Sequence, residues 1–359
     1  MATLTETAYY ARNFIKYGLL TLFGLVIVRG AIIISVRIYK DVFPPPPPPP
    51  TVKYGKLPRL PISQFPNLPT TITYKLETLD GSASADNLRG VKNPAPGQAK
   101  VFVMPQGAPN LLSIERSKER AIALGFREDP ELLDNSIYRF RNELAFATLD
   151  VHATTQTFHY IYSWQGNQSI LGNPPRSTDD AQRTLENYLN SAGILADDLK
   201  NGKALFKFMR ANGTGLSEVS SLSDADFVRV DLFRQDLDNL PIYTSNPAEG
   251  SVWGIVTGAG KLQGQIIEVV YRYFPVERQE FATYPIKSSA QAWQELGQGK
   301  GFVVSLGDNS NGNITIRRIY LAYLDVTLNP VRFMQPIYVF EGDNDFVAYV
   351  PAVADEWMQ

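Results

Sequence analysis

A long apolar segment directly before a run of prolines constrains the fold of this chain more than any other feature. Residues 17–36 read YGLLTLFGLVIVRGAIIISV, and residues 44–50 are seven consecutive prolines. At 1.5 Å per helical residue, a segment of this length crosses a hydrocarbon core of about 30 Å. Proline cannot continue the helix, because its ring fixes φ and removes a hydrogen-bond donor. The sequence therefore predicts a transmembrane helix over residues 17–40 and a proline-rich linker over residues 41–69.

A cleaved signal peptide and a buried core helix are the alternatives to a membrane span. No small-residue cleavage motif follows the apolar segment, which argues against a signal peptide. The sequence contains no cysteine, which excludes a lipoprotein anchor and a disulfide framework. We therefore expect an uncleaved, single-pass membrane protein.

The charges that flank the span do not decide its orientation. Arg12 and Lys16 before it are balanced by Arg37 and Lys40 after it. Long domains cross membranes largely regardless of charge, whereas residues 1–16 are too few to form a domain. We therefore expect a cytoplasmic tail over residues 1–16, with the bulk of the chain on the extracytoplasmic side of the cell membrane.

Arg29 lies inside the apolar segment, where an unpaired guanidinium group is costly. Its long side chain can reach the nearer membrane surface and keep the charge hydrated. Alternatively, Arg29 pairs with an acidic or polar group on another transmembrane helix. The second interpretation makes Arg29 a candidate contact with a membrane partner.

The proline run predicts a stiff spacer. Seven residues of polyproline II at about 3.1 Å each hold the following domain about 20 Å from the bilayer. The alternative, a ligand for a groove lined by aromatic residues, is a role typical of cytoplasmic modules. We therefore interpret the run as a polyproline linker.

Composition favours a sheet-rich domain after the linker. The apolar fraction of 44% and the charged fraction of 19% are ordinary for globular proteins. A formal net charge of −2 argues against nucleic acid as a partner, since phosphate binding needs a concentrated basic surface. Tyrosine and phenylalanine, 18 and 19 residues, far outnumber the four tryptophans, and such aromatics favour half-buried strands.

Three helices are predicted, each from a capping residue at its start and a glycine at its end. Asn110 or Ser113 begins the first, Ser177 or Thr178 the second, and Ser288, in a capping box with Gln291, the third. The predicted ends are Gly125, Gly193 and Gly297.

Alternating or continuous apolar runs predict the strands. They cover residues 71–77, 101–104, 138–141, a strand that begins with Leu144 and Phe146, and residues 158–164, 204–209, 227–233, 252–257, 265–274, 302–306, 314–323, 335–340 and 346–351. Helices followed by antiparallel meanders predict an α+β ectodomain, with antiparallel sheets each covered by a helix. We expect two modules, over residues 70–171 and 172–359.

Aromatic residues recur on two of these strands. Phe158, Tyr160, Tyr162 and Trp164 are predicted to share one strand face, as are Ile267, Val269, Tyr271 and Tyr273. The candidate ectodomain contacts are Tyr160, Tyr162, Trp164, Tyr271 and Tyr273.

No pattern in the sequence predicts catalysis, a cofactor or a metal. The two histidines, His152 and His159, lack the nearby ligands of a zinc site. Asp343 and Asp345 fit either a calcium half-site or an ordinary turn, and we favour the turn. Gly258-Ala259-Gly260 lacks the following helix start of a phosphate loop. We therefore expect a protein that is not an enzyme.

The C-terminal third resembles a known family. The motifs YPIKSS (residues 284–289), IYLAY (319–323), QPIYVFEG (335–342) and FVAYVP (346–351) resemble the C-terminal module of the YycH and YycI proteins, and ALGF (123–126) with the strands after it resembles their N-terminal half. These proteins have PepSY-like ectodomains behind a single membrane helix. The resemblance implies a regulator of a membrane sensor histidine kinase, without catalytic residues. The seven-proline spacer departs from the family pattern.

Two functional hypotheses follow. The first is a non-enzymatic, membrane-anchored bacterial protein that binds another envelope or membrane protein and regulates a sensor kinase or envelope process. The second is a structural component of a larger envelope assembly, which includes association with copies of itself. An envelope hydrolase is the least favoured alternative, because neither a nucleophile nor a metal constellation is evident.

Overall fold

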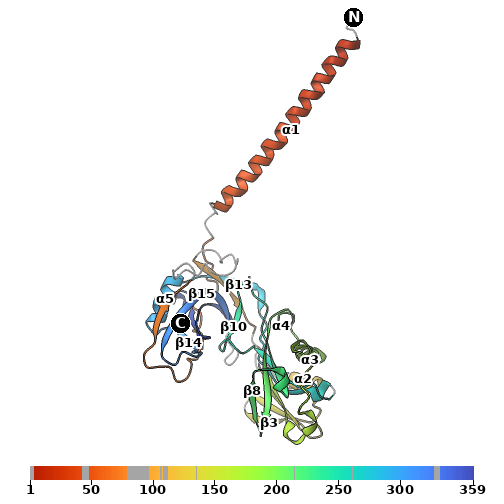
Figure 1. The fold of residues 1–359 in the computed structure, drawn as a ribbon, viewed down its shortest axis with the longest axis vertical. Helices are drawn as coiled ribbons and strands as arrows, with labels where there is room; N and C mark the ends of the chain where they lie inside the picture. Colours follow the sequence, from red (N-terminus) through yellow and green to blue (C-terminus); the bar gives the residue numbers. More distant parts are fainter. Residues whose placement is uncertain are drawn as a thin grey trace. The chain divides into compact units, whose positions relative to one another are not determined.

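A computed structural model describes residues 4–42, 48–78, 97–105, 107, 112–134, 136–213, 215–260, 262–326 and 332–359. The chain divides into two compact units, Met1–Pro49 and Pro50–Gln359. In the first unit, helix α1 runs over Leu4–Val42 (Figure 1). Its segment Tyr9–Tyr39, in which a stretch of 18 residues has a mean hydropathy of 2.4, is long and apolar enough to cross a membrane.

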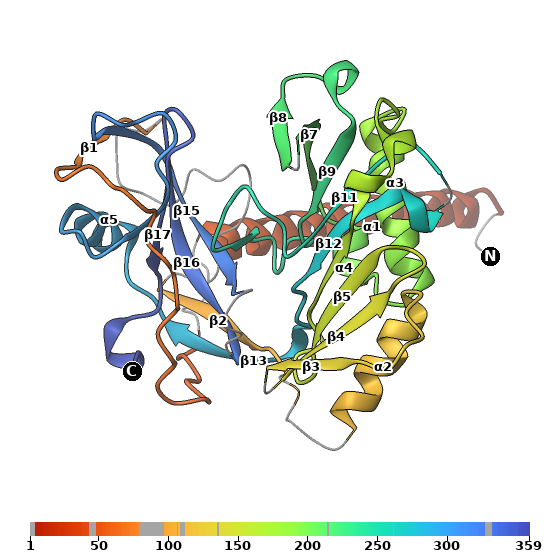
Figure 2. The same cartoon turned by 90° about the horizontal axis from the view of Figure 1, so that it is seen from below.

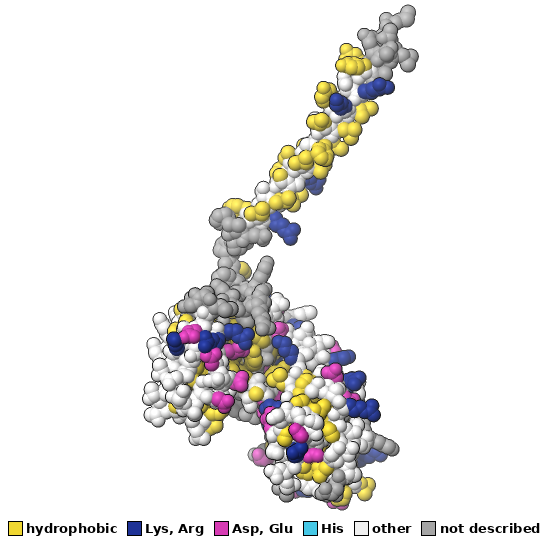
Figure 3. Space-filling model, in the orientation of Figure 1, with side chains coloured by type: hydrophobic (Ala, Val, Ile, Leu, Met, Phe, Trp, Pro, Cys, Tyr) yellow, Lys and Arg dark blue, Asp and Glu magenta, His cyan; other side chains and the backbone are white. Residues whose placement is uncertain are grey.

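Helix α1 starts well before the predicted span. Figure 3 shows hydrophobic side chains along the described part of this helix, with Lys and Arg side chains among them. Of the proline run, Pro48, Pro49 and Pro50 are exposed and belong to neither helix nor strand, while residues 44–47 lie outside the described part of the chain. The expected polyproline conformation therefore stays a prediction.

In the second unit, the described residues form a nine-stranded sheet in which all neighbours are antiparallel. Its strand order is β3-β4-β5-β6-β12-β11-β9-β7-β8. The strands are β3 (Glu131–Asp134), β4 (Ile137–Asn142), β5 (Ala147–His152), β6 (Phe158–Tyr162), β7 (Ala204–Asn212), β8 (Gly215–Val219), β9 (Phe227–Leu232), β11 (Val252–Val256) and β12 (Ile266–Tyr271).

Helices α2 (Ser113–Ala123) and α3 (Thr178–Ser191) pack against this sheet in one hydrophobic core (Figure 2). Ala121 and Leu185 bring the two helices into the same cluster as Leu149 and Val230 of the strands. The short helix α4 (Asp197–Lys200) adds Leu199 to this core. Apolar residues spaced at three and four along α3 make its buried face.

A second, eight-stranded sheet holds the order β1-β15-β16-β17-β14 among the described residues, with β10, β2 and β13 attached. Its strands are β1 (Thr73–Leu76), β2 (Gln98–Val103), β10 (Ile242–Thr244), β13 (Glu277–Pro285), β14 (Phe302–Ser305), β15 (Asn313–Asp325), β16 (Phe333–Gly342) and β17 (Val347–Pro351). Helix α5 (Ser289–Gly297) packs on it through Ala292 and Leu296. The α+β class is confirmed, but this sheet is mixed, because β1 and β10 pair with β15 in parallel.

The strand pairing crosses the expected boundary between residues 171 and 172. Strand β6 pairs with β12 inside the nine-stranded sheet. Strands β1 and β2, from early in the chain, pair with β15 and with β13 and β16 of the C-terminal part. Each sheet is therefore assembled from both halves of the sequence.

The predicted helix starts are confirmed where a serine caps. Ser177 accepts a hydrogen bond from the Asp180 backbone N–H at 3.1 Å, and Ser288 forms the capping box with Gln291. Ser113, in contrast, lies inside α2, whose N-cap residue is Leu112, so the expected cap is wrong there. Asn110 lies outside the described residues.

The predicted helix ends are confirmed for all three helices. Gly125 and Gly193 have positive φ angles of 95° and 66°, as expected for residues that follow a helix. Gly297 is the last residue of α5, as predicted, although the left-handed conformation occurs at Gly299, with φ of 73°.

Replacing Ser288 by alanine should lower the free energy of unfolding by about 1 kcal/mol, because the Gln291 backbone N–H in the N-terminal turn of α5 loses its hydrogen bond to Ser288 Oγ. Chemical denaturation of the wild type and Ser288→Ala measures this change. Gln294→Ala, at an exposed position of the same helix, is the matched substitution. An equal loss in both variants would contradict a capping role for Ser288.

One predicted strand face and one predicted strand start are wrong. A β-bulge between Ile255 and Val256 leaves Ile267 as an extra residue, so Ile267 packs in a different hydrophobic cluster from Val269 and Tyr271. Leu144 and Phe146 lie in the turn between β4 and β5, and do not begin β5.

Candidate binding site

A cavity of about 760 Å³ lies beside the end of α2 and the β4–β5 turn. We call it the tyrosine pocket, after three residues in its wall. It is lined by Leu124, Gly125, Phe126, Asn142, Leu144, Ala145, Phe146, Ala147, Tyr160, Tyr162, Ser163, Asn167, Tyr188 and Gly264. This volume lies within the usual range of ligand sites in proteins, about 300–1,000 Å³.

The residues that follow α2 form the first wall of the tyrosine pocket. The Phe126 backbone N–H donates to the Ala121 carbonyl at 2.8 Å, while Gly125 takes the left-handed conformation. This turn directs Phe126 into the core, where its ring contacts Tyr160 edge-on, with 6.0 Å between the ring centroids.

The turn at residues 143–146, which we call the apolar loop, forms the rim. Asn142 holds it, since its Nδ2 donates to the Gly125 carbonyl at 3.1 Å and its Oδ1 accepts from the Ala145 N–H at 3.0 Å. Leu144 is 96% exposed and Phe146 is 70% exposed. The loop thus presents two large apolar side chains to solvent.

Phe146 also has a strained backbone. Its φ of 51° lies in the left-handed region, which glycine and asparagine tolerate and a bulky residue rarely adopts. Such strain costs on the order of 1 kcal/mol or more and persists where the surrounding structure enforces it. Phe146 therefore lowers the stability of the apolar loop, while its aromatic ring lies at the rim of the pocket.

Tyr160, Tyr162 and Tyr188 supply the polar part of the wall. The Tyr162 hydroxyl accepts a hydrogen bond from Asn167 Nδ2 at 3.1 Å. The Tyr188 side chain is buried, and its hydroxyl has no hydrogen-bond partner among the described residues. Burial raises the pKa of Tyr188 and of Tyr160 above the ordinary tyrosine value, so both phenols stay neutral.

The candidate ectodomain contacts do not form one surface. Tyr160 and Tyr162 line the tyrosine pocket, whereas Trp164 follows β6 in a short 3₁₀ helix and packs against Phe227. The Tyr271 ring is buried, and its hydroxyl donates to the Ile194 carbonyl at 3.0 Å. Tyr273, half-buried, lies against the Arg234 guanidinium group.

Arg29 lies on α1 with little cover from other residues. It makes no ion pair with any residue that the structure describes. Its pairing with another helix therefore stays a prediction.

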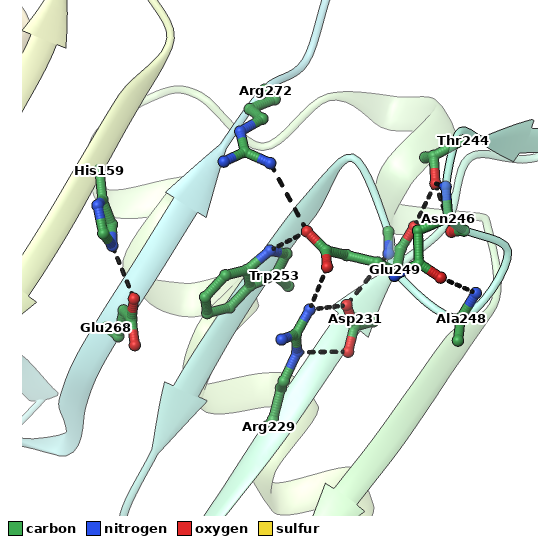
Figure 4. Close-up of polar contacts among 11 residues, drawn as sticks. His159, Arg229, Asp231, Thr244, Asn246, Ala248, Glu249, Trp253, Glu268 and Arg272 are labelled. Atoms are coloured by element: carbon green, nitrogen blue, oxygen red, sulfur yellow. Dashed lines mark hydrogen bonds and ion pairs between the residues drawn. The ribbon is translucent and has the colours of Figure 1, made fainter. Parts of the chain in front are cut away.

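A polar network lies on the face of the nine-stranded sheet opposite to helices α2 and α3 (Figure 4). Arg229 binds the buried Asp231 through two hydrogen bonds of 2.9 and 2.8 Å and stacks on Trp253 at 3.9 Å from the ring centroid. Glu249 accepts from the indole N–H of Trp253 at 2.9 Å and lies 3.4 Å from Arg229. Each charge has a partner, so the network fixes the loop before β11 to the sheet.

The remaining chemical candidates lie in separate places. His159 contacts Glu268 at 2.7 Å on neighbouring strands, and His152 contacts Ser136. Asp343 pairs with Arg317 in the turn between β16 and β17. In the part of the chain that the structure describes, no three His, Asp or Glu residues gather in a way that could hold a metal.

Comparison with known proteins yields no relative. No family model, no curated protein and no solved structure matches the chain. The likeness to the YycH and YycI proteins therefore stays a prediction from the motifs.

Proposed function

We propose that this chain is a non-enzymatic membrane protein, anchored by α1, whose extracytoplasmic domain binds another envelope protein. The observation that carries the proposal is the apolar loop, which holds Leu144 and Phe146 in solvent beside the tyrosine pocket. Exposed apolar side chains around a concave site are typical of docking surfaces. The backbone strain at Phe146 supports a role in binding, because strain of this kind clusters at functional sites.

The resemblance to kinase regulators extends this proposal. A sensor kinase contains both a membrane helix and an extracytoplasmic region, so it offers a surface to α1 and another to the apolar loop. In this proposal Arg29 contacts the partner inside the membrane, and the apolar loop contacts it outside.

Substituting asparagine at Leu144 and Phe146 tests the role of the loop. We expect recovery of the crosslinked partner from native membranes to fall about tenfold or more, since apolar anchors dominate such interfaces. Phe146→Asn should leave the free energy of unfolding unchanged or raise it by up to about 1 kcal/mol, because asparagine tolerates the left-handed backbone. Crosslinking with mass spectrometry and chemical denaturation measure the two effects.

Leu205→Asn is the matched control, as Leu205 is an exposed leucine on β7 outside the pocket. It should retain the partner. Full recovery of the same partner by the loop double variant would contradict the proposal.

A structural component of an envelope assembly is the second candidate function. Within the described residues, the edge strands β3 and β8 pair with a neighbour on one side only. Unpaired strand edges can add a strand from another chain. Crosslinking that recovers mainly copies of the chain itself, joined through β3 or β8 and unaffected by the loop variant, would favour this function.

A further inference from the structure

The charge of the tyrosine pocket restricts what can enter it. None of the described residues that line it carries a charged side chain. A charged group inside would lose its hydration without gaining an opposite charge. The pocket therefore selects an uncharged occupant.

The walls favour an aromatic group. The rings of Phe126 and Tyr160 lie edge to face, and those of Tyr160 and Tyr188 are tilted, with 5.8 Å between centroids. An added ring can continue this arrangement, since aromatic pairs prefer edge-to-face or offset geometry. Phe146 at the rim offers a further, exposed ring.

The size and the polar groups favour a peptide. A cavity of about 760 Å³ holds more than one side chain. The Tyr162 hydroxyl accepts from Asn167 and retains its own O–H, which can donate to a carbonyl group. An extended peptide supplies such a carbonyl at every residue.

We infer that the tyrosine pocket receives a short, uncharged peptide segment of the partner that carries an aromatic side chain. This inference rests on the proposed function, in which the partner is a protein. Leu144 and Phe146 then cover the segment from the rim, and Tyr162 binds its backbone.

A blocked photoreactive peptide tests the inference on the full-length protein in lipid nanodiscs. The probe is acetyl-alanyl-benzoylphenylalanyl-alaninamide, which is uncharged and crosslinks where its ring rests. We expect mass spectrometry to place the crosslinks in residues 124–126, 142–147 and 160–163. Competitor peptides carry phenylalanine, glutamate, lysine or alanine in place of the benzoylphenylalanine of the probe. The phenylalanine peptide should reduce crosslinking of the probe, whereas the glutamate, lysine and alanine peptides should not do so at the same concentration.

Ala145→Trp provides the matched blocking variant, since Ala145 is exposed at the pocket and its substitution leaves the core unchanged. It should lower crosslinking about tenfold, while Ala248→Trp, at an exposed loop position outside the pocket, should not. Tyr162→Phe should weaken competition by the phenylalanine peptide a few-fold, through the lost hydrogen bond.

Crosslinks outside the pocket, or equal competition by the glutamate or lysine peptide, would overturn the inference. If native-membrane crosslinking nevertheless captures the partner in a way that depends on Leu144 and Phe146, the proposed function stands although the inference about the peptide segment fails. If nanodisc lipid suppresses the labelling and the phenylalanine peptide does not, the pocket binds a lipid instead. This outcome also overturns the inference.

Discussion

Replacing Arg234 by methionine is expected to lower the free energy of unfolding of the domain by about 3–5 kcal/mol, because it leaves buried carboxylates without their counter-charge. Arg234 has a side chain only 3% exposed. Its Nε donates to Asp198 at 2.7 Å, and its Nη1 donates to the Phe274 carbonyl at 2.9 Å and to Asp325 at 3.3 Å. Chemical denaturation of Arg234→Met measures the loss.

The Arg234 side chain links the two sheets. Asp198 belongs to α4, beside the nine-stranded sheet, while Asp325 ends β15 of the eight-stranded sheet. Arg234 follows β9 and also stacks on the Tyr273 ring, 4.6 Å from its centroid. Loss of this side chain therefore weakens a contact that links elements of both sheets.

The loss should grow as the pH rises. Burial raises the pKa of Asp325 above its ordinary value, and Arg234 counteracts this rise. In Arg234→Met the pKa rises further, so the folded state keeps a proton that the unfolded state releases above about pH 4. Between these two pKa values the stability of the variant falls with pH, by up to about 1.4 kcal/mol per unit. The difference from the wild type should thus be smaller at pH 4 than at pH 7.

The triple variant Asp198→Leu, Arg234→Met, Asp325→Leu is the control. It removes all three charges together and should recover most of the lost stability, because an apolar replacement of a buried ion group is often neutral or stabilising. A loss in Arg234→Met that does not depend on pH would contradict the role of Asp325.

Local signals predicted the helices well. Ser177 and Ser288 cap their helices through hydrogen bonds within three residues, so the sequence alone contains the information. The same holds for the buried face of α3, which the spacing of Ala181, Leu185 and Leu189 defines. The apolar helix α1 is likewise a property of one continuous segment.

Sheet membership could not be predicted, because it depends on contacts between distant segments. Nothing in Thr73–Leu76 indicates parallel pairing with β15, and nothing in β6 indicates β12 as its neighbour. The strands β3, β8, β10 and β13 lack a clear alternation and were missed: β3 is exposed along its length, and β13 is interrupted by a bulge.

The candidate site was predicted in part. Tyr160 and Tyr162 were chosen as contacts for their place on a strand, and both line the tyrosine pocket. Tyr188 was assigned only to the buried face of a helix. The apolar loop was mistaken for a strand start, since its alternating Leu144 and Phe146 contain none of the usual turn residues. A loop that breaks the local rules in this way is itself a signal of function.

Replacing Arg29 by leucine is expected to favour membrane insertion of α1 by about 3 kcal/mol, the difference between arginine and leucine near the middle of a span. A translocon insertion assay on the α1 segment measures this change. Arg29→Lys, which keeps a charge able to reach the membrane surface, should insert like the wild type.

The same variants separate the two interpretations of Arg29 in crosslinking from native membranes. A pairing role requires that Arg29→Leu lose a membrane partner that the wild type recovers, although its helix inserts better. If the partner is recovered in full, Arg29 serves only to place its charge at the membrane surface, and the contact with the partner is confined to the unit Pro50–Gln359. A loss of both the partner and insertion would contradict both interpretations, because removal of a charge from an apolar helix cannot by itself hinder its transfer into lipid.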